Sequence, residues 1–182
     1  MQRRSFLMAL PAFPLACALP RHALAAAGSV AEIQQNWKQL LATGAEVAPT
    51  TTPISKTEAE WQQLLTPAQF KVLRQEGTEY PNSSPLNAEK RAGIFACAGC
   101  ALPLFSSRMK FESGTGWPSF FTLIPGSLAT KEDFKMIVPR TEYHCVRCGG
   151  HHGHVFDDGP RPTGLRYCNN GVALRFVPQK AA

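Results

Sequence analysis

The chain has 182 residues, enough for one domain with a hydrophobic core. Its apolar content of 44% is ordinary for a globular protein, and its formal charge of +6 falls to +3 once residues 1–25, with three arginines and no acid, are set aside. A surplus this small, without a basic cluster, argues against nucleic acid as a partner.

Residues 1–25 have the pattern of an export signal. Arg3 and Arg4 precede an apolar stretch that is too short and too interrupted by proline to span a bilayer, and an Ala-Leu-Ala cleavage pattern ends at Ala25. The stretch QRRSFLM resembles twin-arginine signals, which implies export of the folded protein to the periplasm. An ordinary secretory signal is the alternative. Cleavage after Ala25 would remove Cys17.

Residues 26–56 are expected to form an N-terminal extension of a helix and a linker. The pattern VAEIQQNWKQLLA, residues 30–42, predicts an amphipathic helix. Residues 43–56 are rich in threonine and proline and have no apolar periodicity, so they read as a linker and possible spacer.

The main domain is expected to occupy residues 57–178 and to begin with two short helices. Each helix has a capping box at its start, Thr57 with Glu60 and Thr66 with Gln69, and Pro67 takes the first position of the second helix. The second helix should end near Gly77, because glycine commonly follows a helix C-terminus.

From residue 93 onward, short apolar or alternating runs predict strands. Gly, Pro, Asn and Asp separate these runs, which are GIFAC, LPLF, FKMIVP, EYHCV, HVF, LRYC and GVALRFV. No stretch in this part has the length of an ordinary helix. The predicted fold is therefore mainly β and antiparallel, with short helices packed at its N-terminal end.

Four of the six cysteines form two CxxC pairs, Cys97/Cys100 and Cys145/Cys148. Each pair follows a strand-like run and leads into a turn, which directs both sulfurs at one point. Two such pairs give a tetrahedral four-thiolate site, which suits one structural zinc ion per chain and is closed to substrate. The 44 intervening residues require the pairs to meet through the fold. Two disulfides, or a dithiol redox pair, are the alternatives.

Cys168 is then the free thiol of the mature chain. A free cysteine is often an inert part of the core. Here Arg166 and Asn170 share the strand parity of Cys168, so a positive charge and an amide donor can lie on its face of the sheet and favour the thiolate.

Histidines and a tryptophan supply further candidates. His151, His152 and His154 follow the second CxxC pair, and because four cysteines already serve the metal, these side chains are available for proton transfer rather than ligation. Trp117, in the glycine-flanked turn SGTGWPSFF, is either core or the wall of a small apolar pocket.

Taken together, these motifs resemble the zinc-containing methionine-R-sulfoxide reductases of the B type. The matching segments, in order, are EWQQLLTPAQFKVLRQEGTEYP, CAGC, SGTGWPSFF, CVRCGGHHGHVFDDGP and RYCNNGVALRF, and they run from about residue 57 to residue 178. The resemblance implies two antiparallel sheets bridged by the zinc site. It also implies an oxidoreductase of protein repair under oxidative stress, which reduces methionine R-sulfoxide in peptides or proteins at the expense of thiols.

The resemblance implies a role for each matching residue. Cys168 would attack the sulfoxide sulfur while a histidine protonates the oxygen, leaving methionine and a cysteine sulfenic acid. His151 and His154 would bind and protonate the substrate, and Arg166 would stabilise the thiolate. Asn170 would hold the site together by hydrogen bonds, and Trp117 would contact the substrate methyl group. Asp158 would be a partner of the histidines.

Three positions depart from the family pattern. Thr115 stands where many relatives carry the cysteine that resolves the sulfenic acid, which predicts regeneration by an external thiol such as a thioredoxin-like protein. His152 and Asn169 stand where relatives usually carry aliphatic residues. His152 is either an extra polar group at the pocket rim or simply exposed.

The main alternative is a non-catalytic, zinc-stabilised β-sheet module that binds a ligand. Such a module need not keep a nucleophile, whereas this chain has Cys168. A nucleic-acid-binding zinc module leaves Cys168 and the histidines unexplained, and an oxidoreductase working through CxxC requires metal-free thiols. We therefore expect an enzyme that is monomeric, has no stable membrane span and acts on oxidised protein or peptide.

Overall fold

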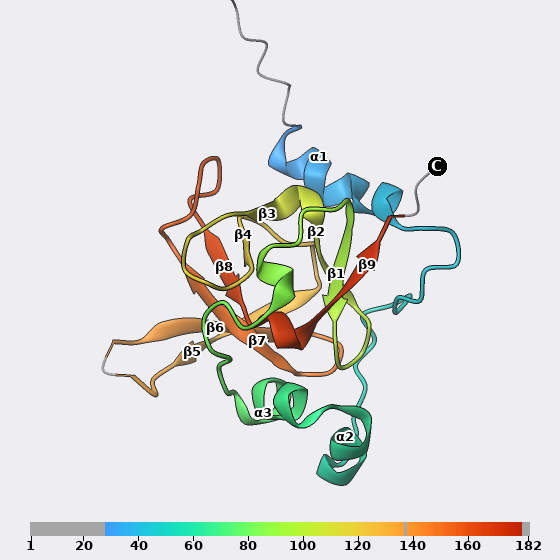
Figure 1. The fold of residues 1–182 in the computed structure, drawn as a ribbon, viewed down its shortest axis with the longest axis vertical. Helices are drawn as coiled ribbons and strands as arrows, with labels where there is room; N and C mark the ends of the chain where they lie inside the picture. The colour runs from blue at the N-terminus through green and yellow to red at the C-terminus, as the bar shows by residue number, and fades with distance from the viewer. Residues whose placement is uncertain (1–27, 137, 180–182) are drawn as a thin grey trace, which may run out of the picture.

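The computed structural model describes residues 28–136 and 138–179, and two antiparallel sheets dominate it (Figure 1). The smaller sheet has the strand order β2 (Pro103–Ser106), β1 (Gly93–Cys97), β9 (Leu174–Pro178). The larger sheet has the order β3 (Lys110–Phe111), β4 (Ser119–Phe120), β8 (Arg166–Asn169), β7 (His151–Phe156), β6 (Arg140–Cys145), β5 (Leu128–Asp133). The prediction of a mainly β fold with two antiparallel sheets is confirmed.

The helices come from the N-terminal part of the described chain and are short. Both predicted capping boxes are present, at the starts of α2 (Glu58–Leu64) and α3 (Pro67–Gln75), and α3 ends at Glu76 in a left-handed conformation, φ 54°, directly before Gly77. The helix expected over residues 30–42 is shorter: α1 (Val30–Gln35) passes into the 3₁₀ turn η1 (Asn36–Leu40). The remaining 3₁₀ turns are η2 (Pro85–Asn87), η3 (Ser107–Met109) and η4 (Gly171–Ala173).

One strand prediction was wrong. The described residues of the run FKMIVP, 134–136, 138 and 139, do not form a strand but lie between β5 and β6. The Asp133 side chain accepts the backbone N–H of Lys135 at 3.0 Å and starts a turn there, and Pro139 has no N–H to give to a sheet. The strand lies earlier, in LATKED, where polar side chains conceal the pattern. The run GVALRFV likewise begins as η4 and becomes strand only at Leu174.

The core lies between the two sheets and is largely aromatic. The Phe105 and Phe120 rings stack with centroids 4.0 Å apart, and Phe95 meets Phe120 edge-on at 5.0 Å. Tyr143 is also fully buried, and its ring meets Phe105 edge-on at 6.4 Å. Because side chains alternate along a strand, burying this face of the larger sheet leaves the opposite face of β5 to β8 for polar groups.

The segment between η1 and α2 has no helix or strand, as expected of a linker, but it docks on the domain rather than standing away from it. The backbone N–H of Ala48 donates to the carbonyl of Ala101 at 2.9 Å, and that of Ile54 donates to the carbonyl of Arg147 at 2.7 Å. Both acceptors belong to the CxxC turns, so this segment is hydrogen-bonded to both turns. The expected export signal, with Cys17, lies outside the described residues.

Within the described ranges, none of the helices is both long enough and apolar enough to cross a bilayer.

Candidate active site and metal centre

The four CxxC cysteines meet in space. Cys97 ends β1 in the smaller sheet and Cys145 ends β6 in the larger sheet, and Cys100 and Cys148 follow in the adjoining turns. The Sγ atoms of Cys97 and Cys148 are 3.6 Å apart, and those of Cys100 and Cys145 are 3.5 Å apart. All four sulfurs lie within 4.8 Å of one another. A tetrahedral zinc with bonds of about 2.3 Å needs sulfurs about 3.8 Å apart, so the donor set fits a closed structural zinc site that bridges the sheets.

The register of the larger sheet gathers the functional side chains on one face. His154 of β7 pairs with Cys168 of β8, and Cys168 pairs with Ser119 of β4. Directly paired residues in an antiparallel sheet point to the same side, with Cβ atoms about 5 Å apart. The predicted base or acid and the predicted nucleophile are therefore cross-strand neighbours.

A bulge in β7 brings His151 to the same face as His154. His144 pairs with His151 and Tyr143 with Gly153, so three residues of β7 oppose two of β6. The extra residue reverses the alternation, and the rings of His151 and His154 lie 5.5 Å apart. Gly153 is required here, since a Cβ would lie 1.9 Å from the carbonyl oxygen of Cys168.

Cys168 opens into a small pocket of about 140 Å³. Four of the residues expected at the site line it: Cys168, His154, Asn170 and Trp117. The sequence reasoning did not identify the other lining residues, which are Thr78, Arg140, Gly153, Phe156 and Asn169. Trp117 and Phe156 give the pocket apolar walls, whereas His154, Arg140 and Asn170 give it polar ones.

Burial and the neighbouring polar groups shift the pKa of the Cys168 thiol in opposite directions. Its burial raises the pKa, while the charge of Arg166 and hydrogen bonds from Thr115 and Arg166 lower it in part. Arg166 itself is buried, and its guanidinium forms a two-point ion pair with Asp158, with N–O distances of 2.7 and 2.8 Å. Asp158 therefore partners Arg166, and its expected partnership with the histidine side is wrong.

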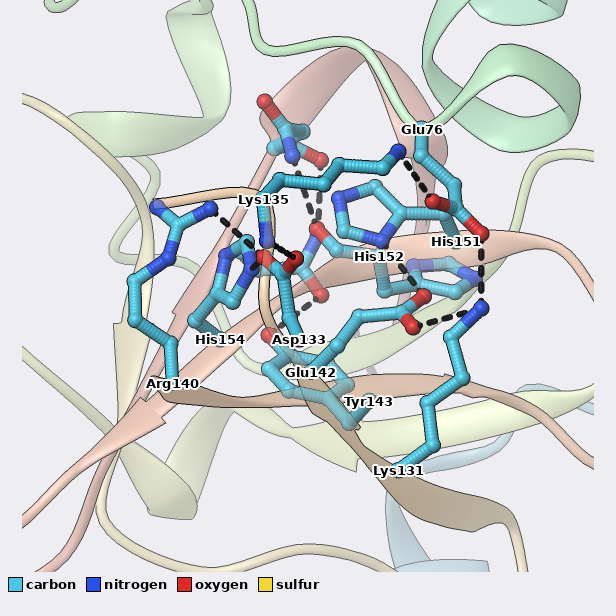
Figure 2. Close-up of polar contacts among 12 residues, drawn as sticks. Glu76, Lys131, Asp133, Lys135, Arg140, Glu142, Tyr143, His151, His152 and His154 are labelled. Carbon is cyan, nitrogen blue, oxygen red and sulfur yellow. Dashed lines mark hydrogen bonds and ion pairs between the residues drawn. The ribbon is translucent and has the colours of Figure 1, made fainter. Parts of the chain in front are cut away.

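His154 belongs to a charged cluster that the sequence did not reveal (Figure 2). Its Nε2 lies 2.8 Å from Oδ2 of Asp133, the last residue of β5, and the same oxygen accepts a hydrogen bond from Nη2 of Arg140 at 2.6 Å. The backbone N–H of Lys135, the imidazole of His154 and the guanidinium of Arg140 all lower the pKa of Asp133, which is a carboxylate at neutral pH. Burial lowers the pKa of His154, and the hydrogen bond to Asp133 acts in the opposite direction.

His151 has a separate partner. Its Nδ1 lies 2.7 Å from Oε1 of Glu142, both side chains are buried, and burial lowers the His151 pKa to about 4. Lys131 bridges Glu142 to Glu76, with Nζ 2.9 Å from Glu142 and 2.6 Å from Glu76 (Figure 2). His151 lines a neighbouring hollow of about 350 Å³ rather than the Cys168 pocket. The sequence predicted the same role for His151 and His154, but only His154 lines the Cys168 pocket.

His152 is neither at the pocket rim nor exposed, so both expectations for it are wrong. It is completely buried, its ring lies parallel to that of Tyr143 at 6.5 Å, and neither ring nitrogen has a hydrogen-bond partner among the described residues. The hydroxyl of Tyr143 donates to Oδ1 of Asn169 at 2.9 Å. The two departures from the family pattern, at 152 and 169, therefore share one buried environment beneath the site.

Glu79 fixes the far wall of the pocket, and sequence reasoning missed it. Its carboxylate accepts the backbone N–H groups of Gly171 and Val172 at 2.6 and 2.9 Å. Its carbonyl accepts the indole N–H of Trp117 at 3.2 Å, and its own N–H donates to Oδ1 of Asn170 at 2.9 Å. Asn170 also donates its amide to the carbonyl of His152 at 3.0 Å. Glu79 thereby holds Asn170 and Trp117 in place. Its only mark in the sequence is that it belongs to the first matching segment, which ends EGTEYP.

The family model and the similar proteins indicate the same family. The chain matches the family described as SelR domain over residues 65–178. Proteins named peptide methionine sulfoxide reductase MsrB are similar to it. That of Methanosarcina barkeri is 53% identical over 128 residues, covering 70% of this chain and 90% of that protein. That of Agrobacterium fabrum is 46% identical over 130 residues, covering 71% and 96%. That of Pseudomonas putida is 50% identical over 130 residues, covering 71% and 98%.

Proposed function

This chain belongs to the SelR domain family of peptide methionine sulfoxide reductases, and we propose that it reduces methionine R-sulfoxide in peptides with Cys168 as the nucleophile. The observation that carries the assignment of the nucleophile is the pocket in which Cys168 meets His154, Trp117 and Asn170. In the described residues the other cysteines are the four of the metal centre, which leaves Cys168 as the thiol available for chemistry.

The pocket is asymmetric, which suits a chiral sulfur. Trp117 and Phe156 offer apolar surface to the methyl group, and Arg140, together with His154 once it has taken the thiol proton, offers hydrogen-bond donors to the oxygen. One epimer places its oxygen on the polar side and its methyl group on the apolar side while presenting sulfur to Cys168. The opposite epimer exchanges two of these groups and is rejected.

Asp133 sets the protonation of His154 in this proposal. Because Asp133 is ionised, Nε2 of His154 carries the proton that binds it at 2.8 Å, and Nδ1 of the neutral ring is a proton acceptor. His154 then takes the thiol proton of Cys168 and delivers it to the sulfoxide oxygen. Asp133 stabilises the imidazolium formed in between, as the carboxylate does in a nucleophile–histidine–acid triad. Asp133 is thus a positioning residue.

The atoms balance without another reactant in the first half of the cycle. The thiol of Cys168 and the sulfoxide give a sulfenic acid and methionine: a sulfur–oxygen bond breaks in the substrate, one forms at Cys168, and the thiol proton ends on the transferred oxygen. The substrate sulfur gains two electrons and the Cys168 sulfur loses them. Arg166, fixed by Asp158, supports the negative charge on Cys168 during attack.

An external thiol closes the cycle. Residue 115 is threonine, whose hydroxyl contacts Ser113 at 2.9 Å and cannot form a disulfide with the sulfenic acid. A first external thiol condenses with the sulfenic acid and releases water, and a second one displaces the mixed disulfide to restore Cys168. A thioredoxin-like protein in the periplasm would supply both thiols, consistent with the twin-arginine-like pattern of residues 1–25. The enzyme would act as a monomer, its zinc having a structural role only.

The test uses the mature chain, residues 26–182, and its Cys168→Ser variant with the resolved R- and S-sulfoxides of a methionine peptide and dithiothreitol. We expect turnover of the R epimer alone, lost in the variant, while both proteins bind one equivalent of zinc. The S epimer is an internal control for nonspecific reduction. No turnover of either epimer by the folded, zinc-loaded chain would favour the non-catalytic binding module instead.

A further inference from the structure

An apolar loop tip lies beside the proposed active site, and none of residues 28–136 and 138–179 covers it. In the β5–β6 loop, Phe134, Met136 and Val138 are 68%, 60% and 71% exposed. They are three of the five large apolar side chains that the described residues expose; the others are Leu64 on α2 and Tyr80. Exposed apolar groups concentrated on one short loop mark a contact surface rather than the usual scatter of single residues.

The loop is fixed at its base by charged groups, which keeps its tip away from the core. Asp133 and Arg140, the residues on either side of the loop, form the ion pair of 2.6 Å described above. Glu76, at the end of α3, binds Lys131 on β5 at 2.6 Å and also forms an ion pair with Lys135 in the loop itself (Figure 2). The hairpin extends outward from the body of the molecule (Figure 1).

The tip is connected to the Cys168 pocket through Phe134. Phe134 lines the hollow of about 350 Å³ together with Thr78, Arg140 and His154. The same three residues also line the Cys168 pocket of about 140 Å³. When a substrate side chain occupies the smaller pocket, the adjacent residues of the substrate chain therefore lie over the hollow and next to Phe134. The smaller pocket suits the end of one side chain, so the rest of a polypeptide must lie outside it.

We propose that the tip formed by Phe134, Met136 and Val138 is a docking surface for the apolar residues that flank an oxidised methionine in a polypeptide substrate. Methionine is mostly buried among apolar residues, and its oxidation disrupts the packing around it. The segment that presents a sulfoxide then also presents apolar neighbours, which the tip can cover. Free methionine sulfoxide has no such neighbours and gains nothing from the tip. This inference rests on the proposed function and adds a sequence preference to it.

The test compares the wild-type chain with a triple variant, Phe134→Ser, Met136→Ser and Val138→Ser, and with Leu64→Ser as the matched control. Leu64 is 59% exposed but lies on α2, away from the hairpin (Figure 1). Three R-sulfoxide substrates are used with dithiothreitol: N-acetylmethionine sulfoxide amide, an unstructured peptide with leucine and valine on both sides of the sulfoxide, and the same peptide with serine flanks. Retained zinc and circular dichroism verify folding.

We expect the triple variant to lose about 10-fold in kcat/KM on the apolar-flanked peptide, the order expected from losing roughly 55 Å² of apolar contact. Its kcat/KM on the amide and the serine-flanked peptide should stay within about twofold of wild type, and Leu64→Ser should match wild type throughout. Equal losses on all three substrates would overturn the proposal, as would no loss. A loss seen only when thioredoxin replaces dithiothreitol would assign the tip to the reductant instead. No turnover of the amide by wild type would refute the proposed function itself.

Discussion

Replacing Asp133 by asparagine tests the proposed proton path most directly. The substitution keeps the size of the side chain and removes its charge. Asp133 binds both His154 and Arg140 through Oδ2, so the asparagine oxygen can still accept a hydrogen bond but no longer offsets a charged imidazolium. The nucleophile is unchanged, whereas Arg140, which lines the pocket, also loses its ion pair with Asp133. A merely structural role of Asp133 would leave the pH dependence of the reaction where it is.

The expected size of the effect follows from the contacts. A hydrogen bond to a charged group contributes about 1.5–3 kcal/mol, and the Asp133 side chain is only 9% exposed, so water screens it weakly. If this contribution is made when His154 is charged in the transition state, kcat falls by roughly 10- to 100-fold, at about 1.4 kcal/mol per factor of ten.

The direction of the pH shift is fixed by the same contact. Burial lowers the pKa of His154, and its hydrogen bond to Asp133 raises it, so the variant has the lower His154 pKa. The neutral ring is the form that accepts the thiol proton. The acid limb of the kcat profile should therefore move to lower pH while the plateau falls. Titratable groups that face His154 and stay in the variant include Arg140, which also lowers its pKa, His151 on the same strand and Cys168 on the neighbouring strand.

The assay measures kcat and KM for N-acetylmethionine R-sulfoxide amide between pH 4.5 and 9 with dithiothreitol in excess. Glu132→Gln is the matched control, because it removes one carboxylate from the adjacent, exposed position of β5. We expect its profile to coincide with wild type. If Asp133→Asn keeps kcat within about twofold and leaves the acid limb in place, His154 does not depend on Asp133 and the proposed path is wrong.

Three further outcomes follow from the structure. Thr115→Cys should convert the sulfenic acid into an intramolecular disulfide with Cys168, seen by mass spectrometry as a loss of two hydrogens after one substrate equivalent; a persistent sulfenic acid would show that residue 115 does not reach Cys168. Cys100→Ser should lose zinc and lower the unfolding temperature by more than about 10 °C, whereas the same substitution at Cys168 should keep the metal. Burial lowers the pKa of His152 to about 4, so protonation favours the unfolded chain as the pH falls below about 6.5, and His152→Leu should remove about 2 kcal/mol of destabilisation at pH 5 in denaturant titrations. An equal pH dependence of stability in both proteins would mean that another group governs it.

Local patterns in the sequence were enough to predict the helix starts and the metal ligands. A capping box is made by residues three apart, so Thr57/Glu60 and Thr66/Gln69 act as expected wherever the helices pack. The two sulfurs of a CxxC turn likewise converge for local reasons, and two matched turns leave few alternatives to a four-sulfur site. Strands with apolar faces, such as β1, were also recognisable.

The sequence-based predictions were wrong where residue composition alone did not indicate which side chains are buried. FKMIVP has the apolar content of a strand but is a projecting loop, because Asp133 is engaged with Lys135, His154 and Arg140 at its base. The LATKED strand was missed because it is the edge strand of the larger sheet, where none of its side chains is fully buried and no apolar alternation is needed. His152 was expected at the pocket rim or exposed, whereas the bulge in β7 turns it into the core.

For the candidate site, the sequence by itself was enough to single out Cys168 as the candidate nucleophile, the four cysteines of the zinc site and the set of side chains from which the proposed chemistry is drawn. These follow from residue type and short spacing, which do not depend on distant parts of the chain. Only the tertiary structure decided that His154 rather than His151 lines the Cys168 pocket, that Asp158 serves Arg166, and that Asp133 serves His154. Each of these depends on strand register across β5 to β8, and register is set by long-range pairing and one bulge that no local pattern records.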